Sequence, residues 1–496
     1  MTTGEATSAE EFAARFNEFM EWCRGQADDK ENPFVELLRP HLGRDPRELP
    51  VLGVGFLPHD HPNLQLALDA YMAGPGRETK VIGILGARMH HDLGLSTVLA
   101  VPMFRPGPVD LVERPVGVDE VLACVRAGLY LVSDGGSRYA VMVCNQEGPR
   151  GPEVRVEVLA TERQQAAATL DELRRLMGEH NVYRGKVVSL GNGDMRRGMP
   201  GLGVTFHTLP QLSRGDIVLA DGVLQRVERH TIGIALHREV LLAGRRHLKR
   251  GLLLHGPPGT GKTLTVMYLL AQMPERTTLL LSGKGMGAVG ASCALARQLQ
   301  PATVVLEDVD LVAEDRGHFP GSNPLLFELL DEMDGLAEDA DVIFLLTTNR
   351  ADLLEPALAA RPGRVDQAVD VALPDATCRQ RLLELYARGL AMDVEDWAPV
   401  VEATDGVSAS FIKELLREAA LVSAEAGDSV VTAAHVQSAL QELTVAGGAL
   451  TAALLGAGGD RAPTSGPPRR GPRPGPVIGL PASIRSVNRP LGPGYV

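Results

Sequence analysis

Cysteine and tryptophan are scarce in this sequence, and the cysteine pattern limits what the chain can be. Five cysteines are scattered over 496 residues, none of them in a CxxC pair, and only two tryptophans occur. An odd number of scattered cysteines is typical of reduced thiols, so we expect neither a disulfide framework nor a zinc ribbon. The pattern favours a cytoplasmic protein. The cysteines are Cys23, Cys124, Cys144, Cys293 and Cys378.

Long apolar runs are also absent. The longest uncharged run, residues 443–459, has 17 residues, of which five are glycine. A membrane-spanning helix needs about 20 mostly apolar residues, so this run is too short and too flexible to cross a bilayer. No basic-then-apolar leader opens the chain, and we expect no signal peptide and no membrane partner.

Basic residues are fewer than acidic residues, by 49 to 62, which gives a formal net charge of −13. A negatively charged phosphate backbone is attracted to basic surfaces, so this excess of acid disfavours nucleic acid as the partner. We therefore expect no nucleic-acid binding.

The length and the changes of pattern along the chain predict several structural units. A chain of 496 residues is too long for one compact core. Ser8 and Glu11 form a capping box ahead of apolar residues at helical spacing, which predicts an amphipathic helix. The glycine-rich stretch 191–203 predicts a loop near a domain edge. The predicted units are a helical N-terminal segment (1–49), an α/β or α+β domain (50–210), a unit of alternating strands and helices (211–374), a helical unit (375–445) and a disordered tail rich in Gly, Pro and Arg (446–496).

A glycine-rich turn between a predicted strand and a predicted helix is the most specific motif. Residues 256–263, GPPGTGKT, match the pattern GxxxxGK[ST]. Its glycines allow backbone N–H groups to surround phosphate oxygens at the positive end of the next helix. We expect Lys262 to reach the β- and γ-phosphates and Thr263 to ligate Mg²⁺. The predicted phosphate-binding residues are Gly256, Pro257, Pro258, Gly259, Thr260, Gly261, Lys262 and Thr263.

A second motif places two adjacent carboxylates at the end of an apolar run. In VVLEDVD, residues 304–310, Glu307 precedes Asp308, which reverses the usual order of Asp before Glu. Both side chains remain carboxylates, so a water-mediated Mg²⁺ contact survives the reversal. Positioning the attacking water is more exacting, since a misplacement of about 1 Å can cost ~100-fold in rate. We expect a working site, because an inert one would more naturally carry an amide or alanine.

With these motifs in order, the chain resembles the classical AAA clade of AAA+ ATPases. GPPGTGKT is similar to the clade's Walker A, and VVLEDVD stands where its Walker B belongs. TTNR (347–350) resembles sensor 1, and ALAARPGRVD (357–366) resembles the second region of homology. DGVSASFIKELLREAAL (405–421) resembles the lid helix, with Ala409 where glycine is usual. The order Glu then Asp is similar to that in the mitochondrial AAA translocase that inserts the Rieske subunit.

The resemblance, which covers about residues 221–445, implies a fold and a chemistry. The implied fold is a P-loop NTPase AAA+ module, an α/β parallel sheet flanked by helices and followed by a small helical lid. The implied cofactors are ATP and Mg²⁺, and the implied activity is ATP hydrolysis. Nucleotide contacts are also implied for Leu264, Ser408 and Ala409.

The resemblance also assigns roles to the polar residues around the phosphates. Glu307 takes the metal-side position and Asp308 the water-side position, and Asn349 orients the attacking water. Arg361 and Arg364 are implied to act as arginine fingers on the γ-phosphate of a neighbouring subunit. That role implies a ring, a homohexamer, because a cation provided in trans stabilises the charge on the transferred phosphoryl group.

Other stretches depart from the family pattern. The pore-loop stretch GKGMGAVGAS has Ala288 before Val289 where an aromatic residue is usual, although Met286 could substitute as a soft contact. Threading of an unfolded chain is therefore in doubt. No HExxH motif occurs in the sequence, so the metalloprotease fused to some AAA rings is not expected.

Two weaker signals each have a functional interpretation and an ordinary structural one. His59-Asp60-His61 and His90-His91-Asp92 are either metal ligands or ordinary histidines of loops and edges, and we favour the second. The C-terminal Tyr495-Val496 is similar to the tail through which proteasomal ATPases dock on a proteolytic ring. An ordinary disordered end is the favoured alternative.

The sequence leaves more than one function open. The favoured function is a ring ATPase that hydrolyses ATP to remodel a client protein or protein complex, selected by the N-terminal domain. The alternative is a slowly hydrolysing, ATP-binding switch for assembly or scaffolding. Docking on a proteasome-like ring is a further possibility.

Overall fold

The computed structural model describes residues 31–87, 93–148, 151–192, 202–282, 288–310, 340–352 and 365–443, together with residues 15, 18, 328, 331–333, 335 and 337. The amphipathic helix expected from Ser8 falls outside the described residues apart from Arg15 and Glu18. The tail expected from residue 446 and the cluster His90-His91-Asp92 also lie outside them.

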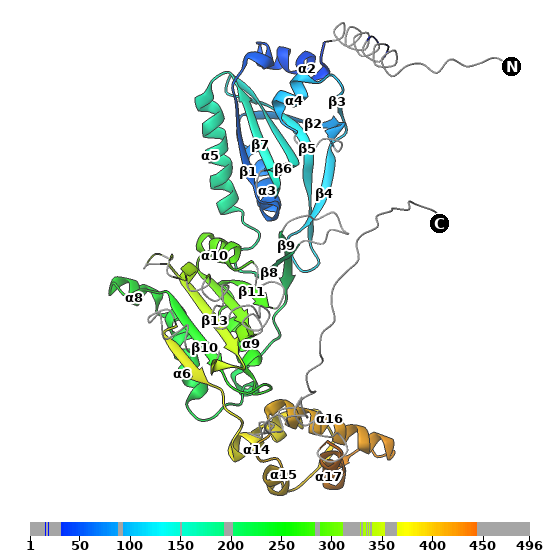
Figure 1. Cartoon of the computed structure of the whole chain (residues 1–496), viewed down its shortest axis with the longest axis vertical. Coiled ribbons are helices and arrows are strands. Elements are labelled where there is room, and N and C mark those ends of the chain that lie inside the picture. Colours follow the sequence, from blue (N-terminus) through cyan, green and yellow to red (C-terminus); the bar gives the residue numbers. More distant parts are fainter. Residues whose placement is uncertain are drawn as a thin grey trace, which may run out of the picture.

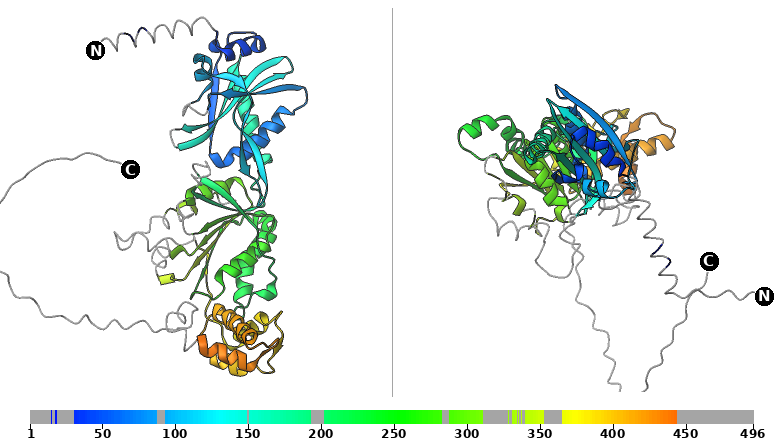
Figure 2. Two further views of the ribbon diagram at one scale, coloured as in Figure 1. Left: turned by 90° about the vertical axis from the view of Figure 1, so that its right-hand side faces the viewer. Right: turned by 90° about the horizontal axis from the view of Figure 1, so that it is seen from above.

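The described elements form three tiers along the long axis of the molecule (Figure 1). The first tier holds a sheet with helices around it, the second a larger α/β sheet, and the third a group of helices. Figure 2 shows the same order from the side.

The first tier is built on an antiparallel sheet with both faces covered. Its strands are β1 (Val51–Phe56), β2 (Arg77–Leu85), β3 (Arg105–Gly107), β4 (Asp110–Pro115), β5 (Val121–Asp134), β6 (Ser137–Gly148) and β7 (Gly151–Ala160). The strand order is β1-β7-β6-β5-β2-β3, with β4 paired to the first half of β5. Its helical elements are α2 (Pro33–Leu42), η1 (Pro46–Glu48), η2 (Pro58–Asp60), α3 (His61–Met72), α4 (Leu95–Ala100) and α5 (Arg163–Glu179).

Successive apolar side chains on these strands point to opposite faces, which explains why the sheet is covered on two sides. On β7, Val154, Val156 and Val158 are buried against α3 and α5. Leu159 faces the other way and joins the core made with α2 and α4. A strand with apolar residues on both faces is stable only between two layers.

The predicted boundary at residue 49 is wrong. Phe34, Val35 and Leu38 on α2, together with Leu49 after η1, are buried in the core of the first sheet. The segment 33–49 therefore belongs to the first tier, because its apolar side chains are buried in that core.

The second tier has a mostly parallel sheet of the kind expected for residues 211–374. Its strands are β8 (Val187–Asn192), β9 (Leu202–His207), β10 (Arg250–His255), β11 (Thr277–Ser282), β12 (Ala302–Glu307), β13 (Val342–Thr348) and β14 (Gln367–Asp370). The strand order is β14-β10-β13-β12-β11-β8-β9, and every pair except β8 with β9 is parallel. The described helical elements are η5 (Arg214–Asp216), α6 (Val223–His230), α7 (Ile232–Leu236), α8 (Arg238–Ala243), α9 (Lys262–Ala271) and α10 (Val289–Gln298).

Helices lie on both faces of this sheet, which is why its strands read as continuous apolar runs. All seven residues of β13 are buried. On β10, Leu253 contributes to one core with α10, while Leu252 and Leu254 contribute to the other with α6 and α9. This pattern is typical of a doubly covered parallel sheet, and the predicted fold class is confirmed.

The predicted boundary at residue 210 does not match the strand pairing. The strand β8 pairs in parallel with β11, from Val187 opposite Thr278 to Ser189 opposite Leu280, and β9 extends the same sheet. The loop expected over 191–203 is also wrong at its ends, since Gly191 and Gly203 are paired residues of β8 and β9. Local glycine content suggested a loop, but strand pairing in the tertiary structure decides the element.

The segment that joins the first two tiers is bonded to both. The backbone N–H of Val182 donates to Asn63 Oδ1 on α3, at 2.9 Å. The Tyr183 hydroxyl donates to the carbonyl of His59 in η2, and its ring stacks on Phe206 of β9. Gly185 N then donates to Thr277 Oγ1 of β11 at 3.0 Å. The first tier is therefore attached directly to the edge of the second sheet.

The third tier is mainly helical, as expected for 375–445, with one small addition. Its elements are α14 (Ala376–Tyr386), β15 (Met392–Asp393), α15 (Ala398–Ala403), α16 (Ala409–Glu425), β16 (Val431–Thr432) and α17 (Ala433–Gln441). The two short strands pair in parallel with each other. Asp375 caps α14 and Ser408 caps α16, each through its side-chain oxygen.

A buried ion pair fastens three strands of the second tier at the start of β11, β12 and β13. Arg276 Nη1 lies 2.7 Å from Asp341 Oδ1, and the two side chains are 5% and 6% exposed. The same guanidinium donates to the Ala302 carbonyl at 2.6 Å and to Thr303 Oγ1 at 3.2 Å. Arg276 thus contacts the start of β12 and the residue directly before β13, at the edge opposite to the carboxyl ends of these strands.

We predict that Asp341→Ala lowers the free energy of unfolding by about 3–5 kcal/mol, because it leaves the buried Arg276 guanidinium without its counter-ion. Urea denaturation followed by circular dichroism measures the change. Glu414→Ala, which removes the exposed pair with Arg417, is the control and should cost no more than about 1 kcal/mol. Equal effects of the two substitutions would contradict the structural role of the buried pair.

Candidate functional site

The phosphate-loop motif directly follows β10 and ends in the first two residues of α9. Gly256 has φ 142° and Gly259 has φ 75°, both in the region that favours glycine. A Cβ on Gly256 would lie 2.3 Å from the carbonyl oxygen of Val371, just after β14. The loop therefore needs glycine at this position both for its backbone conformation and for its close packing on the neighbouring segment.

Lys262, the first residue of α9, folds over this loop. Its ammonium group donates to the carbonyl oxygens of Gly256 and Pro257, at 2.8 and 2.7 Å. Burial lowers the pKa of Lys262, while the carboxylates of Asp308 and Asp310 raise it in opposition. A buried ammonium held by carbonyl dipoles beside two acids is suited to binding the negative oxygens of a phosphate.

Glu307, the last residue of β12, lies next to the loop at the carboxyl end of the sheet. Burial and the adjacent Asp308 carboxylate raise the pKa of Glu307, and a hydrogen bond from Thr263 lowers it. Its Oε1 atom is buried and has no hydrogen-bond partner among the described residues. Thr263 and Glu307 thus form a pair of oxygen ligands of the kind Mg²⁺ prefers.

Asp308 and Asn349 meet at the ends of neighbouring strands. Asn349, which follows β13, donates from Nδ2 to Asp308 Oδ1 at 3.2 Å. The Asp308 N–H donates to Thr347 Oγ1 on β13, at 3.0 Å. The water-side acid and the residue assigned to orient water are therefore in direct contact. Their roles stay predictions.

Asp310 is a residue of this site to which the sequence reasoning assigned no function. It is 6% exposed, and its Oδ1 accepts hydrogen bonds from Thr348 Oγ1 at 2.9 Å and from Asn349 N at 3.2 Å. These bonds fix the backbone of Asn349 relative to the acidic strand end. Its position two residues after Asp308 in an acidic run was the only available signal.

The third tier reaches the phosphate loop at the start of α16. Ser410 N donates to the Gly259 carbonyl at 3.0 Å, and Ser410 Oγ does so at 3.3 Å. A Cβ on Gly259 would lie 2.8 Å from Ser408 Oγ. The predicted nucleotide contacts Ser408 and Ala409 are therefore adjacent to the loop, while Leu264 is 37% exposed in the first turn of α9. Sequence reasoning missed Ser410.

Several predicted residues cannot be placed. Arg361 and Arg364 lie outside the described residues, as does Met286 of the pore-loop stretch. Ala288 is described, and it stands directly before α10. The arginine-finger assignment and the pore-loop departure therefore stay predictions.

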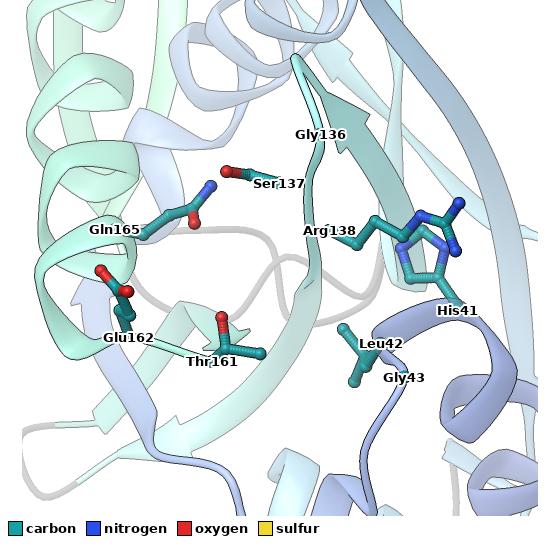
Figure 3. Close-up of a pocket in the computed structure, with 9 residues that line it drawn as sticks. All are labelled: His41, Leu42, Gly43, Gly136, Ser137, Arg138, Thr161, Glu162 and Gln165. Atoms are coloured by element: carbon teal, nitrogen blue, oxygen red, sulfur yellow. The ribbon is translucent and has the colours of Figure 1, made fainter.

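A separate polar hollow of about 400 Å³ lies in the first tier (Figure 3). It is formed where α2 ends, where β5 turns into β6, and where α5 begins. His41 Nε2 at this hollow lies 3.1 Å from the carbonyl oxygen of Tyr139. The residues lining the hollow are His41, Leu42, Gly43, Gly136, Ser137, Arg138, Thr161, Glu162 and Gln165.

The alternative of a metal site at His59-Asp60-His61 finds no support in the part of the chain that the structure describes. No group of three or more His, Cys, Asp or Glu residues suited to a metal occurs there. His61 is fully buried, and its Nε2 lies 2.9 Å from the Val125 carbonyl oxygen. Burial lowers the pKa of His61 to about 4.

Among the described helices, none has the length and apolar character needed to cross a membrane.

The residues present fit a magnesium–nucleotide complex. The glycine loop and Lys262 would hold the phosphates, and Thr263 with the unpaired Oε1 of Glu307 would hold the metal. The contact between Ser410 and Gly259 closes the loop from the side of the third tier. Mg²⁺ bound here would neutralise charge on the phosphate oxygens.

Comparison with protein families agrees with this geometry. Residues 252–373 match the model described as ATPase family associated with various cellular activities (AAA). Residues 401–444 match the model described as Archaeal LonB, AAA+ ATPase LID domain. The two matches correspond to most of the second-tier sheet and to the last helices of the third tier.

Curated relatives are similar to part of the chain. The ATP-dependent zinc metalloprotease FtsH of Mesoplasma florum is 34% identical over 206 residues, which cover 39% of this chain and 32% of the relative. The FtsH of Mycoplasma mobile is 30% identical over 272 residues, covering 52% and 38%. The FtsH of Corynebacterium glutamicum is 35% identical over 212 residues, covering 40% and 24%. The chain therefore spans about a third of the length of the relatives it matches.

We predict that, as the pH falls, Mg²⁺ binding at this site begins to weaken at a higher pH than it would with a glutamate of ordinary pKa. Glu307 must be ionised to hold Mg²⁺, and its pKa is raised above the ordinary value of 4.5, so protonation begins at a higher pH. Below that pKa, the affinity should fall roughly tenfold per pH unit. Mg²⁺ titration of nucleotide binding between pH 8 and pH 5 measures this fall.

Glu307→Gln cannot ionise at this position and should make the pH dependence less steep, with weaker Mg²⁺ binding wherever Glu307 is ionised in the unmodified protein. Glu425→Gln, at the exposed end of α16, is the control and should behave as the unmodified protein. A Glu307→Gln protein with an unchanged pH dependence would show that another group controls metal binding.

Proposed function

Because this chain is an AAA+ ATPase that uses ATP and Mg²⁺, we propose that it works as a ring that couples ATP hydrolysis to remodelling of a protein or protein complex. The observation that carries the proposal is that three features lie together in the described residues. They are the phosphate loop, the acids at the end of β12 and the contact of Ser410 with Gly259. The relatives named as ATP-dependent proteases support a protein as the client.

Proteolysis itself is not proposed for this chain. The relatives are named zinc metalloproteases, and the matched segment covers 24–38% of the three described above. The printed sequence holds no HExxH motif, whose two histidines bind zinc in proteases of that type. What the chain shares with these relatives supports the ATP-driven step alone.

The proposed chemical step uses residues at the ends of three neighbouring strands. Phosphate oxygens would replace the carbonyl acceptors that Lys262 now contacts on the phosphate loop. Asp308 would accept a proton from, or orient, the attacking water, and Asn349 would fix that water through its amide. The in-line attack then needs positive charge on the far side of the γ-phosphate.

We assign that charge to Arg361 and Arg364 of a neighbouring copy, which makes a homo-oligomeric ring, with six subunits, part of the proposal. An exposed apolar ridge on α7 and α8 supports association with another chain. Leu236 is 74% exposed and Val240 is 71% exposed. The helix α8 lies on a margin of the second tier (Figure 1). Large apolar side chains that stand together at a surface are typical of an interface.

The remaining parts of the proposal rest on the sequence alone. A cytoplasmic location is supported by the scattered cysteines; the four in the described residues are buried and form no disulfide with one another. The first tier would select the client. Docking of the tail with Tyr495-Val496 on a proteasome-like ring stays a secondary possibility, since Gly494 stands where the docking tail has an apolar residue.

The second candidate function, a slowly hydrolysing assembly switch, is favoured by one feature. The pore-loop stretch has Ala288 at the position of the usual aromatic residue, and an alanine offers little surface to grip a chain. Steady-state ATP turnover separates the two functions. A remodelling ATPase should turn over ATP at a rate that Lys262→Ala abolishes, whereas equal turnover by both proteins would end the enzyme interpretation.

We predict that Asp308→Asn captures the client. This variant keeps the phosphate loop and Lys262, so it should bind ATP while losing at least about 100-fold in turnover through the missing carboxylate. Affinity purification with ATP and quantitative mass spectrometry should then enrich particular proteins over bait-free resin. Lys262→Ala, which should not bind ATP, is the matched control and should lose the same proteins. A capture list that does not differ between the variants would remove the main support for remodelling.

We predict that Leu236→Asp combined with Val240→Asp breaks the oligomer, because two charges would be buried in the proposed interface. Sedimentation velocity with saturating ATP should show the unmodified chain as a ring and the variant as smaller species. Val118→Asp, a 55% exposed position in the first tier, is the control and should leave the oligomer intact. A monomeric unmodified chain at saturating ATP would refute the ring.

A further inference from the structure

Asp308 has an unusual backbone conformation at the turn from β12 into the segment that follows. Its φ is 50°, and apart from glycines the described residues include one other positive φ, at Arg245. The left-handed region is unfavourable for residues with a Cβ, although aspartate tolerates it better than most. Such a conformation persists only when neighbouring groups hold it.

One side chain is placed to hold this conformation. The parallel pairing of β12 with β13 ends at Leu306 opposite Leu346, so the N–H of Asp308 has left the strand ladder. That N–H donates instead to the hydroxyl of Thr347, at 3.0 Å. A backbone donor at a buried strand end needs a partner, and here a side chain of the next strand provides it.

The conformation matters because of the reversed acidic pair. Aspartate is one methylene shorter than the glutamate usual at the water-side position, so its carboxylate reaches less far from the same backbone. In this structure Asp308 Oδ1 nevertheless lies 3.2 Å from Asn349 Nδ2. Asp308 also acts on the pKa of both Lys262 and Glu307, which places it among the phosphate- and metal-binding groups.

We infer that Thr347 is a positioning residue, whose hydroxyl holds the left-handed turn that brings the short carboxylate of Asp308 to the attacking water. This inference rests on the proposed water-side role of Asp308. Thr347 is 1% exposed and lies on β13, so it acts through the Asp308 backbone.

The role depends on the hydroxyl and not on the volume of the side chain. Valine has nearly the same shape as threonine but cannot accept the Asp308 N–H, and that donor would be left unpaired in a partly buried turn. Serine keeps the hydroxyl and loses the methyl group. A comparison of Thr347→Val with Thr347→Ser therefore separates hydrogen bonding from packing.

The test measures steady-state ATP turnover by the whole 496-residue chain, with kcat and KM separated. Thr347→Val should lower kcat about tenfold or more, since a small displacement of a catalytic group has a large effect on rate. KM for ATP and the affinity for a fluorescent ATP analogue should stay within about twofold, because the phosphate-binding groups are unchanged. Thr347→Ser should restore kcat to within about threefold of the unmodified protein.

Two further variants keep the test decisive. Thr278→Val makes the same substitution at a buried threonine near the start of β11, and it should leave kcat unchanged. Thr347→Ala also lacks the hydroxyl and replaces Thr347→Val if that variant does not fold. An unchanged kcat in either folded variant that lacks the hydroxyl, or a serine variant as slow as the valine variant, would overturn the inference.

The Asp308→Asn protein distinguishes this inference from the role it rests on. If Asp308→Asn turns over ATP normally, the water-side role of Asp308 is wrong, and the inference about Thr347 is wrong with it. If Asp308→Asn is inactive while Thr347→Val is fully active, only the positioning role of Thr347 is refuted. If both variants are slow, adding Thr347→Val to Asp308→Asn should cause no further loss, since both changes disable one group.

Discussion

The parallel register of β10, β13 and β12 is the constraint on which the site depends. The three strands are adjacent in the sheet, with His255 paired to Thr348 and Leu306 paired to Leu346. Because parallel strands end at the same edge, the residues that follow them lie together. The phosphate loop, the two acids and Asn349 are brought within reach of one another by this alignment.

The alignment is held from three sides by interactions outside the site. Two apolar cores cover the faces of the sheet, one with α10 and the other with α6 and α9. At the opposite edge, the buried pair of Arg276 and Asp341 joins the first residues of the strands. A shift of one strand would expose apolar residues and separate the buried charges, so the register is strongly determined.

The third tier completes the site, and the first tier is fastened to the same sheet at its far edge. Ser410 at the start of α16 bonds to the phosphate loop at Gly259, so the third tier contacts the loop directly. Tyr183 and β8 connect the first tier to β11, which is the neighbour of the acidic strand β12. The bond from Gly185 to Thr277 lies at the first residue of β11, whereas the acids lie at the carboxyl end of β12.

The sequence by itself determined the chemistry and the local elements of the site. A strand, a glycine turn and the start of a helix are encoded within fourteen consecutive residues, 250–263. Residues 304–310 and 342–349 likewise each encode an apolar run with a polar end. The predicted AAA+ ATPase module is confirmed for that reason. The tertiary structure alone decided that β8 and β9 join the second sheet, that α2 belongs to the first core, that Ser410 touches the loop, and that Asp308 turns left-handed onto Thr347. Each of these depends on contacts between residues distant in the chain, and propensity and spacing, which act over a few residues, carry no information about them.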